Sequence, residues 1–261
     1  MKINWQLILL IVVDLFLGVY LVAAFTVLNK TDKANRLCET VNIQIEDKDA
    51  TGFISKPEVE EQLIKAGLYP KMKPMNSIPI RKIEENLQHT PFVRTAECYK
   101  AQDGSVRIKL TQRMPKLRIK AVSGDDYYID DNNSIMPNST YTSDLIIATG
   151  NINRWYAQNY LAPMTSAIIS QDVWEKQIEQ IHVLPDKGIE LVPRVGDHVV
   201  YIGKLPESKN AKEREKLIKE FIEKKLERLE TFYRYGLSQA GWNKYKLINL
   251  EFDNQIICKK K

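Results

Sequence analysis

The longest hydrophobic stretch of the chain is residues 7–28, which a single charged residue, Asp14, interrupts. A helix rises about 1.5 Å per residue, so this stretch is ~33 Å long and matches the ~30 Å hydrocarbon core of a bilayer. The pattern predicts a transmembrane anchor that follows a short tail of residues 1–6. A cleaved signal peptide that ends near Val22 is the alternative, although the stretch is longer than the hydrophobic core of ordinary signal peptides.

Asp14 is the unusual residue of the predicted anchor, because a carboxylate in mid-span costs ~2.5–3.5 kcal/mol on insertion scales. Two interpretations stay open for it: a tolerated or protonated acid, and a polar contact with another membrane helix. The flanking charges do not decide the orientation of the anchor. Lys2 precedes it and three basic residues follow it, but large domains are translocated largely regardless of such charges.

After a linker of residues 29–40, residues 41–115 show the pattern of a small α+β domain. An alternating segment predicts a first strand, a capping box opens a first helix, and a second helix pattern follows. Asp-Gly between two alternating runs predicts a closing hairpin. The order β-α-α-β-β allows the two helices to cover one face of a small sheet. These signals lie at residues 41–45, at Ser55 and Glu58, at residues 80–87, and at residues 92–110 with the turn at Asp103 and Gly104.

Residues 116–261 predict a second α+β domain, in which short strands are combined with one long helix. The helix pattern of residues 211–235 carries apolar residues on one face, among them Ile218, Ile222 and Leu226. Two strands finish the chain, and the last strand of an open sheet often lies at its edge. The strand patterns lie at residues 127–137, 145–150, 180–192, 199–203, 245–252 and 255–259.

Several motifs resemble known bacterial domains. In the first region, Phe53-Ile54-Ser55 opens the first helix and Pro91-Phe92-Val93 enters the hairpin, which resembles a polypeptide-transport-associated (POTRA) domain. In the second region, several motifs resemble the β-domain of the bacterial division protein family FtsQ, also called DivIB. Those motifs are the YYID…MP hairpin of residues 127–137, the Pro-Arg-Val-Gly turn at Arg194, and the closing strands. At the end of the first region, Gln112-Arg113-Met114-Pro115 resembles the exit of the POTRA domain in the same family.

The resemblance implies a single-pass protein of the cell inner membrane, with its N-terminus in the cytoplasm and its bulk in the periplasm at the division septum. It implies a non-catalytic scaffold of the divisome that needs no cofactor. Such a scaffold binds FtsB/FtsL-like bitopic partners and links them to control of septal peptidoglycan synthesis. The alternative is a periplasmic membrane-anchored cell-wall enzyme or its regulator. A third possibility, a receptor of outer-membrane assembly, is disfavoured because no barrel-like series of alternating strands follows the first domain.

The resemblance also implies a partner site on the two final strands, where FtsB would add as a further strand. Backbone hydrogen bonds give affinity in this mode, and alternate side chains give specificity. Phe252 aligns with an aromatic residue that family members use, and the alternative is that Phe252 fills the core. The residues expected at this site are Leu250, Phe252, Gln255, Ile256, Ile257 and Cys258.

Composition and motif searches disfavour other classes of function. The net charge of +5, from 38 basic and 33 acidic residues, is too dilute to predict a nucleic-acid surface. Three widely spaced cysteines predict neither a disulfide framework nor a zinc site. The Asp/Asn-rich residues 125–133 lack the glycine and distal glutamate of a calcium loop and predict a turn. His198 is expected in a solvated turn, and Arg194 either binds a carboxylate or anchors its own turn. No metal or catalytic motif is recognisable.

Overall fold

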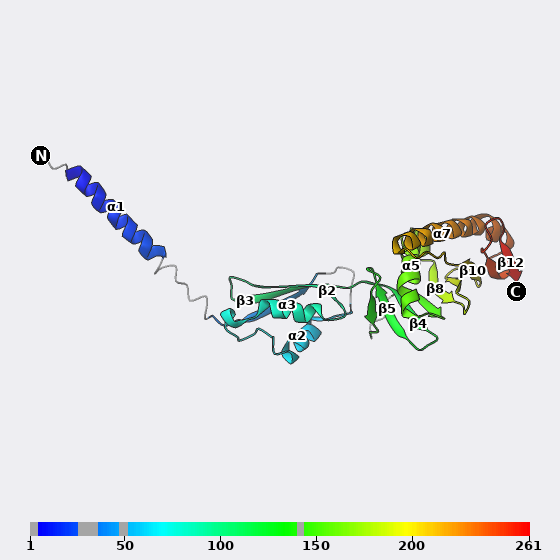
Figure 1. The fold of residues 1–261 in the computed structure, drawn as a ribbon, viewed down its shortest axis with the longest axis horizontal. Coiled ribbons are helices and arrows are strands. Elements are labelled where there is room, and N and C mark those ends of the chain that lie inside the picture. Colours follow the sequence, from blue (N-terminus) through cyan, green and yellow to red (C-terminus); the bar gives the residue numbers. More distant parts are fainter. Residues whose placement is uncertain (1–4, 26–35, 47–51, 140–143) are drawn as a thin grey trace. The chain divides into compact units, whose positions relative to one another are not determined.

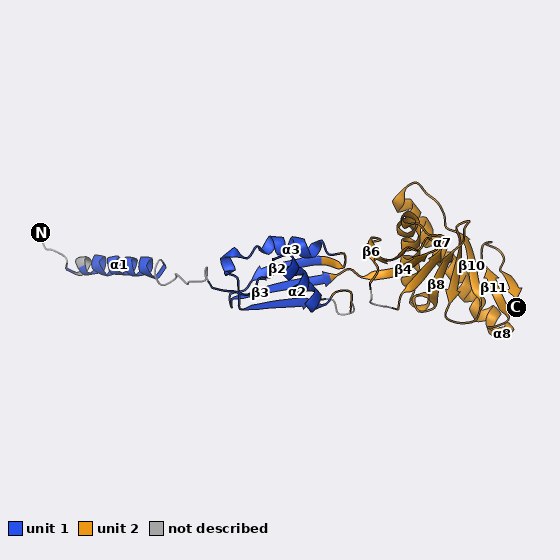
Figure 2. Cartoon of the chain, turned by 90° about the horizontal axis from the view of Figure 1, so that it is seen from below, with its two compact units in different colours: residues 1–46, 55–90, 95–111 blue, residues 47–54, 91–94, 112–261 orange. Residues whose placement is uncertain are grey.

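The computed structural model describes residues 5–25, 36–46, 52–139 and 144–261. The chain divides into two compact units, which Figure 2 shows in different colours. Unit 1 consists of Met1–Glu46, Ser55–Thr90 and Thr95–Thr111, and unit 2 consists of Asp47–Ile54, Pro91–Arg94 and Gln112–Lys261.

Helix α1 (Trp5–Ala23) begins just before the hydrophobic stretch near the N-terminus and covers most of it (Figure 1). Among the residues described, no helix combines the length and the apolar character needed to cross a membrane. The anchor predicted for residues 7–28 is therefore not confirmed. Residues 26–28 of that anchor, 1–4 of the predicted tail and 29–35 of the predicted linker lie outside the described residues.

Unit 1 contains the predicted β-α-α-β-β order. Ser55 begins helix α2 with a capping box, in which the Glu58 carboxylate accepts the Ser55 backbone N–H at 2.7 Å. The sheet order is β1-β3-β2, with β1 parallel to β3. Buried Val59, Leu63 and Ile83 join strand residues in the core. The elements are β1 (Thr40–Ile45), α2 (Lys56–Lys65), η2 (Met75–Ser77), α3 (Ile80–Gln88), β2 (Val93–Lys100) and β3 (Ser105–Gln112).

Unit 2 is built on a nine-stranded mixed sheet in the order β12-β11-β10-β9-β8-β7-β4-β5-β6. Strand β4, which was not predicted, pairs parallel with β7 and antiparallel with β5, so it joins two parts of the sheet. The strands are β4 (Pro115–Ala121), β5 (Asp126–Asp130), β6 (Ile135–Pro137), β7 (Ile146–Gly150), β8 (Ile178–Val183), β9 (Gly188–Pro193), β10 (Val199–Lys204), β11 (Tyr245–Asn249) and β12 (Ile257–Lys260).

Two helices of unit 2, α5 and α7, pack on each other and bury one common core with the sheet (Figure 1). They lie in the crossovers between the parallel pairs β7–β8 and β10–β11, since parallel neighbours need such a connection. Asn210 caps α7 by accepting the N–H groups of Lys212 and Glu213. The helices are α4 (Arg154–Tyr156), η3 (Ala157–Leu161), α5 (Ala162–Ile169), α6 (Asp172–Glu175), α7 (Ala211–Phe232), η4 (Tyr233–Leu237) and α8 (Ser238–Ala240).

Candidate partner-binding edge

Strand β12 is the outermost strand at one end of the sheet in unit 2. It pairs antiparallel with β11, with Ile248 opposite Cys258 and Asn249 opposite Ile257. An edge strand presents backbone N–H and C=O groups that another strand can bind. The prediction that the chain ends in an edge strand is therefore confirmed, whereas the binding of a partner there stays a prediction.

The predicted site residues differ in their accessibility. Leu250 is fully buried and its N–H donates to the Tyr201 carbonyl at 2.8 Å, so its side chain belongs to the core and is not available to a partner. This placement corrects the expectation for Leu250. Ile256 and Cys258 are half-buried and pack against the same core.

Phe252, Gln255 and Ile257 are exposed. Phe252 and Ile257 each expose 48% of their surface, so the alternative in which Phe252 fills the core is wrong. An exposed phenylalanine beside an edge strand is an apolar anchor of the kind that partner proteins use. Asp14 is exposed on α1, and its role stays a prediction.

Basic residues of α7 hold the chain between β11 and β12. The Lys225 ammonium donates to the carbonyls of Leu250 at 2.7 Å and Glu251 at 2.8 Å, and it lies 3.6 Å from the Asp253 carboxylate. Arg228 donates to the carbonyls of Leu250 and Gln255 at 3.3 and 3.0 Å. The turn that carries Phe252 is thus fixed at several points.

Lys225 is almost fully buried, and this burial lowers the pKa of its ammonium. Its carbonyl partners and the nearby carboxylate compensate for the loss of water. This role of Lys225 was not predicted from the sequence. A signal was present, because Lys225 follows Ile222 by three residues and therefore falls on the apolar face of α7.

A groove of about 760 Å³ lies beside this turn. The end of α7, η4 and the β11–β12 connection line it, with apolar contributions from Phe232, Tyr235 and Ile256. Arg228 and Gln255 add polar groups at the same wall. The groove can therefore accept an apolar side chain of a bound segment next to the open strand edge.

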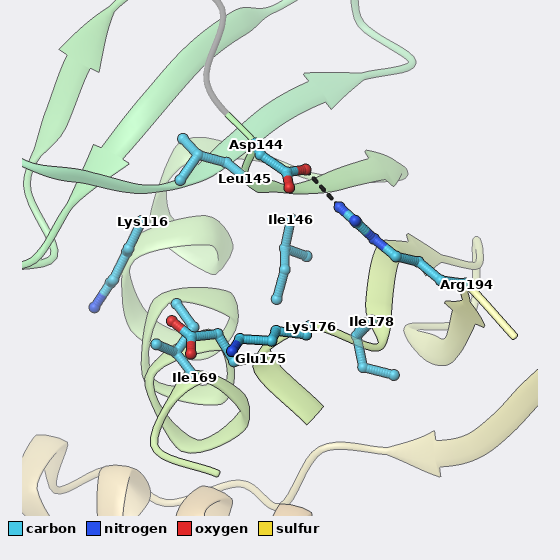
Figure 3. Close-up of a pocket in the computed structure, with 9 residues that line it drawn as sticks. All are labelled: Lys116, Asp144, Leu145, Ile146, Ile169, Glu175, Lys176, Ile178 and Arg194. Carbon is cyan, nitrogen blue, oxygen red and sulfur yellow. Dashed lines mark hydrogen bonds and ion pairs between the residues drawn. The ribbon is translucent and has the colours of Figure 1, made fainter. Parts of the chain in front are cut away.

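A second pocket, of about 260 Å³, has a charged lining (Figure 3). Arg194 contacts the Asp144 carboxylate at 2.5 Å, and its backbone N–H donates to the Gln177 carbonyl. Of the two expectations for Arg194, the side chain meets the binding of a carboxylate, which its own chain supplies. Lys116 extends away from this ion pair and donates to Asn133 and Ser166. Arg194 and Lys116 thus have partners within the chain, and the described residues that line this pocket include no nucleophile–base pair.

His198 is buried, which corrects the expectation of a solvated turn residue. Its Nε2 lies 2.7 Å from the Tyr233 hydroxyl, and only 4% of its surface is exposed. Loss of water lowers the pKa of the imidazole, although Asp197 opposes this effect. His198, which precedes β10, is buried because Tyr233 of η4, a residue distant in sequence, covers it in the folded chain.

The Asp/Asn-rich segment forms a turn, as expected. Asp130 accepts the backbone N–H groups of Asn132 and Ser134 at 3.0 and 2.7 Å, and its other oxygen accepts Arg113 at 2.8 Å. Within the described part of the chain, no three histidine, cysteine, aspartate or glutamate residues are grouped as metal ligands. Cys38, Cys98 and Cys258 are free thiols.

The chain combines two domains. Residues 36–111 match a POTRA-like domain, and a mixed β-sheet domain with a long helix follows it. Residues 114–259 match the family model described as FtsQ/DivIB, C-terminal related. This match spans more than half of the chain, and the chain belongs to that family. Such domains are typically non-catalytic, and the relation suggests a protein of the cell envelope. No curated protein matches the chain.

Proposed function

We propose that this protein is a non-catalytic scaffold of the bacterial divisome that binds FtsB/FtsL-like bitopic partners through strand β12. The single observation that carries the proposal is an open edge strand, flanked by exposed Phe252, in a domain related to FtsQ/DivIB. Through these partners the scaffold links the septum to control of peptidoglycan synthesis.

The partner adds to β12 as a further strand in this proposal. Cys258 lies opposite Ile248 and faces the core, so Ile257 and Lys259 project from the other face of β12. A partner strand that places an apolar residue beside Ile257 and an acidic residue beside Lys259 matches this edge. Phe252 and the groove beside the turn then receive a second, apolar part of the partner.

The lysines at the end of the chain have a second role in the proposal. Lys259 and Lys260 are exposed, whereas Lys261 contacts Asp197 at 2.5 Å. Lysines on an edge strand oppose pairing with another copy of the same edge. They also attract an acidic partner, and this attraction weakens as salt increases.

The proposal places the protein in the cell inner membrane, with residues 7–28 as the anchor, residues 1–6 in the cytoplasm and the bulk in the periplasm. Its support is the hydrophobic sequence of residues 7–28 and the family relation. Protease added to spheroplasts should digest the chain after the anchor. Full protection in spheroplasts with intact membranes would contradict this orientation.

Deletion of residues 255–261 is the direct test of partner binding. The full chain and the deletion variant are each purified with tagged FtsB/FtsL-like partners, and partner recovery is measured. The deletion should abolish recovery, because it removes β12 and the lysines. Val122→Ala is the control, since Val122 is an apolar residue 82% exposed that follows β4, away from β12 in the sheet order. Equal recovery with and without residues 255–261 would refute the proposed edge.

A separate assay distinguishes the scaffold from a cell-wall enzyme. The purified full chain is incubated with peptidoglycan, and released fragments are measured. We expect no turnover. Sustained release of peptidoglycan fragments would instead favour the cell-wall enzyme, provided that deletion of residues 255–261 leaves the release unchanged.

A further inference from the structure

Unit 2 carries a further pocket, whose aromatic wall is formed by residues that the partner-binding edge does not use. Its volume is about 280 Å³. Trp155, Tyr156 and Tyr160, from α4 and η3, line it together with residues of the β8–β9 turn and of the segment that follows β10. The volume lies just below the usual range of ~300–1,000 Å³ for ligand pockets, which suits a small ligand or one unit of a polymer.

The aromatic rings are held rigidly. Tyr156 and Tyr160 are stacked with centroids 4.9 Å apart, and Trp155 lies 5.5 Å from Tyr160. The buried guanidinium of Arg214 lies 5.7 Å from the Trp155 ring centroid and 5.2 Å from that of Tyr160. Arg214 is itself fixed by hydrogen bonds to Asn159 at 2.6 and 3.2 Å.

Trp155 nevertheless exposes 58% of its surface, so a large aromatic ring is presented to solvent on a rigid support. Burial of such a side chain normally contributes to stability, and an exposed tryptophan of this kind is a common binding anchor.

Two tyrosine hydroxyls add hydrogen-bonding capacity to the pocket. Tyr156 and Tyr160 are each only 7% exposed. Neither hydroxyl oxygen is among the fully buried side-chain atoms that lack a hydrogen-bond partner in the described part of the chain. Each hydroxyl therefore reaches the accessible space of the pocket, where water or a ligand can bond to it.

The rim of the pocket contains both signs of charge. Asp186 and Glu207 carry carboxylates, and Lys187 and Lys204 carry ammonium groups. Lys204 lies 3.6 Å from Asp186, and Lys187 donates to the Asn151 carbonyl at 2.8 Å. An anionic ligand would therefore meet two carboxylates and a cationic ligand would meet two lysines. A purely apolar ligand would leave the tyrosine hydroxyls without partners.

We propose that this pocket binds a saccharide ring. A pyranose ring has a face of C–H groups and an edge of hydroxyl groups that donate and accept. The C–H face can stack on Trp155, because the negative face of an aromatic ring attracts polarised C–H groups. The sugar hydroxyls then reach the Tyr156 hydroxyl, the carboxylates and the lysines. The inference uses no residue of the β12 edge and is independent of the proposed scaffold role.

The test measures binding of soluble oligosaccharides to the purified full chain, kept in a detergent without a sugar head group. The probes are tetramers of β-1,4-linked N-acetylglucosamine, β-1,4-linked glucose and α-1,4-linked glucose. Tryptophan fluorescence and calorimetry give the affinity. Saturation-transfer NMR shows which sugar protons contact the protein. We expect at least one tetramer to bind saturably at millimolar concentration or below, with the strongest transfer to protons of one ring face.

Two variants and a matched control sharpen the test. Trp155→Ala should weaken binding by ~10-fold or more, the loss of about 1.4 kcal/mol. Tyr156→Phe keeps the ring stack and removes one hydroxyl, so it should weaken binding by a smaller factor. Trp242→Ala removes a tryptophan that is 38% exposed and lines a different pocket, and it should leave the affinity unchanged.

Three results would overturn the proposal. The first is that no tetramer binds the folded wild-type chain, as judged by its circular dichroism. The second is equal affinity of the wild type and a folded Trp155→Ala variant. The third is that Trp155→Ala abolishes capture of a protein partner while no tetramer binds, which would make Trp155 a protein-binding anchor instead.

Discussion

The two edge strands of the sheet in unit 2 are protected against pairing with another chain in different ways. At one edge, β6 has three residues and ends at Pro137, and its central Met136 is fully buried against Phe53 and Tyr128. Arg113 donates to the Ile135 carbonyl of this strand at 3.1 Å. A short strand, a proline and a cover of side chains all prevent pairing with another chain.

The other edge, β12, has exposed side chains and no such cover among the described residues. Its protection is electrostatic, from Lys259 and Lys260, and charge can be overcome by a partner of opposite charge. The comparison indicates that the covered β6 edge serves stability and the open β12 edge serves recognition. Variants at the two edges should therefore differ in whether they change folding or binding.

The largest effect is expected at the covered edge. Arg113→Ala should destabilise the protein by ~3–5 kcal/mol, because it leaves the buried Asp130 carboxylate without its cation. Urea unfolding monitored by fluorescence measures this change. Arg81→Ala is the matched control, since Arg81 forms an exposed ion pair with Glu85, and such pairs contribute ~0–1 kcal/mol. Equal effects of the two substitutions would contradict the assigned role of Arg113.

Lys225→Met tests the attachment of the open edge to α7. We expect a loss of ~1–3 kcal/mol of stability, because the Glu251 carbonyl loses its donor and the Leu250 carbonyl keeps only the longer bond from Arg228. Hydrogen exchange should accelerate in the connection between β11 and β12 more than in β4 and β5. Lys224→Met is the control, since the Lys224–Asp253 pair is exposed. Unchanged exchange in the β11–β12 connection would show that Lys225 does not hold the turn.

Phe252→Ala should act on recognition and not on folding. We expect partner affinity to fall by ~2 kcal/mol or more if Phe252 is a binding anchor. The urea midpoint should change little, because about half of this side chain is exposed. Titration of the full chain with an FtsB/FtsL-like partner measures the affinity. An unchanged affinity would restrict the recognition site to β12 itself.

The smallest effect is the pH dependence that His198 contributes. Its folded-state pKa is lowered below the unfolded value of ~6.5, because burial disfavours the imidazolium. Below that pH the unfolded state binds more protons, so stability should fall as the pH decreases from ~6.5 towards the folded-state pKa and stay constant above. Urea unfolding at pH 7.5 and 5.5 measures the difference. His198→Gln should reduce it, and an identical pH difference in this variant would contradict the assignment.

The local patterns of the sequence were sufficient to predict most elements. Alternation predicted β1, turn residues between strand-like runs predicted the β5–β6 and β8–β9 hairpins, a capping box predicted the start of α2, and an apolar stripe predicted α7. These signals depend on neighbouring residues, because the periods of strands and helices and the hydrogen bonds of a cap are local properties. The motifs of the two domains also indicated the FtsQ/DivIB relation that the family model supports.

The tertiary structure alone decided which residues are buried in unexpected places and which strands are neighbours. Strand β4 was not predicted although basic and apolar residues alternate along it, the local pattern of a strand, and only the fold shows that it joins β7 to β5. The turn around His198 predicted a solvated imidazole, and the apolar face of α7 carries Lys225 without revealing its partners; residues distant in sequence supply the hydrogen bonds of both buried groups. The physical reason is that burial and sheet order depend on contacts between distant segments, and a charge or an imidazole becomes buried only where the fold supplies its hydrogen-bond partners.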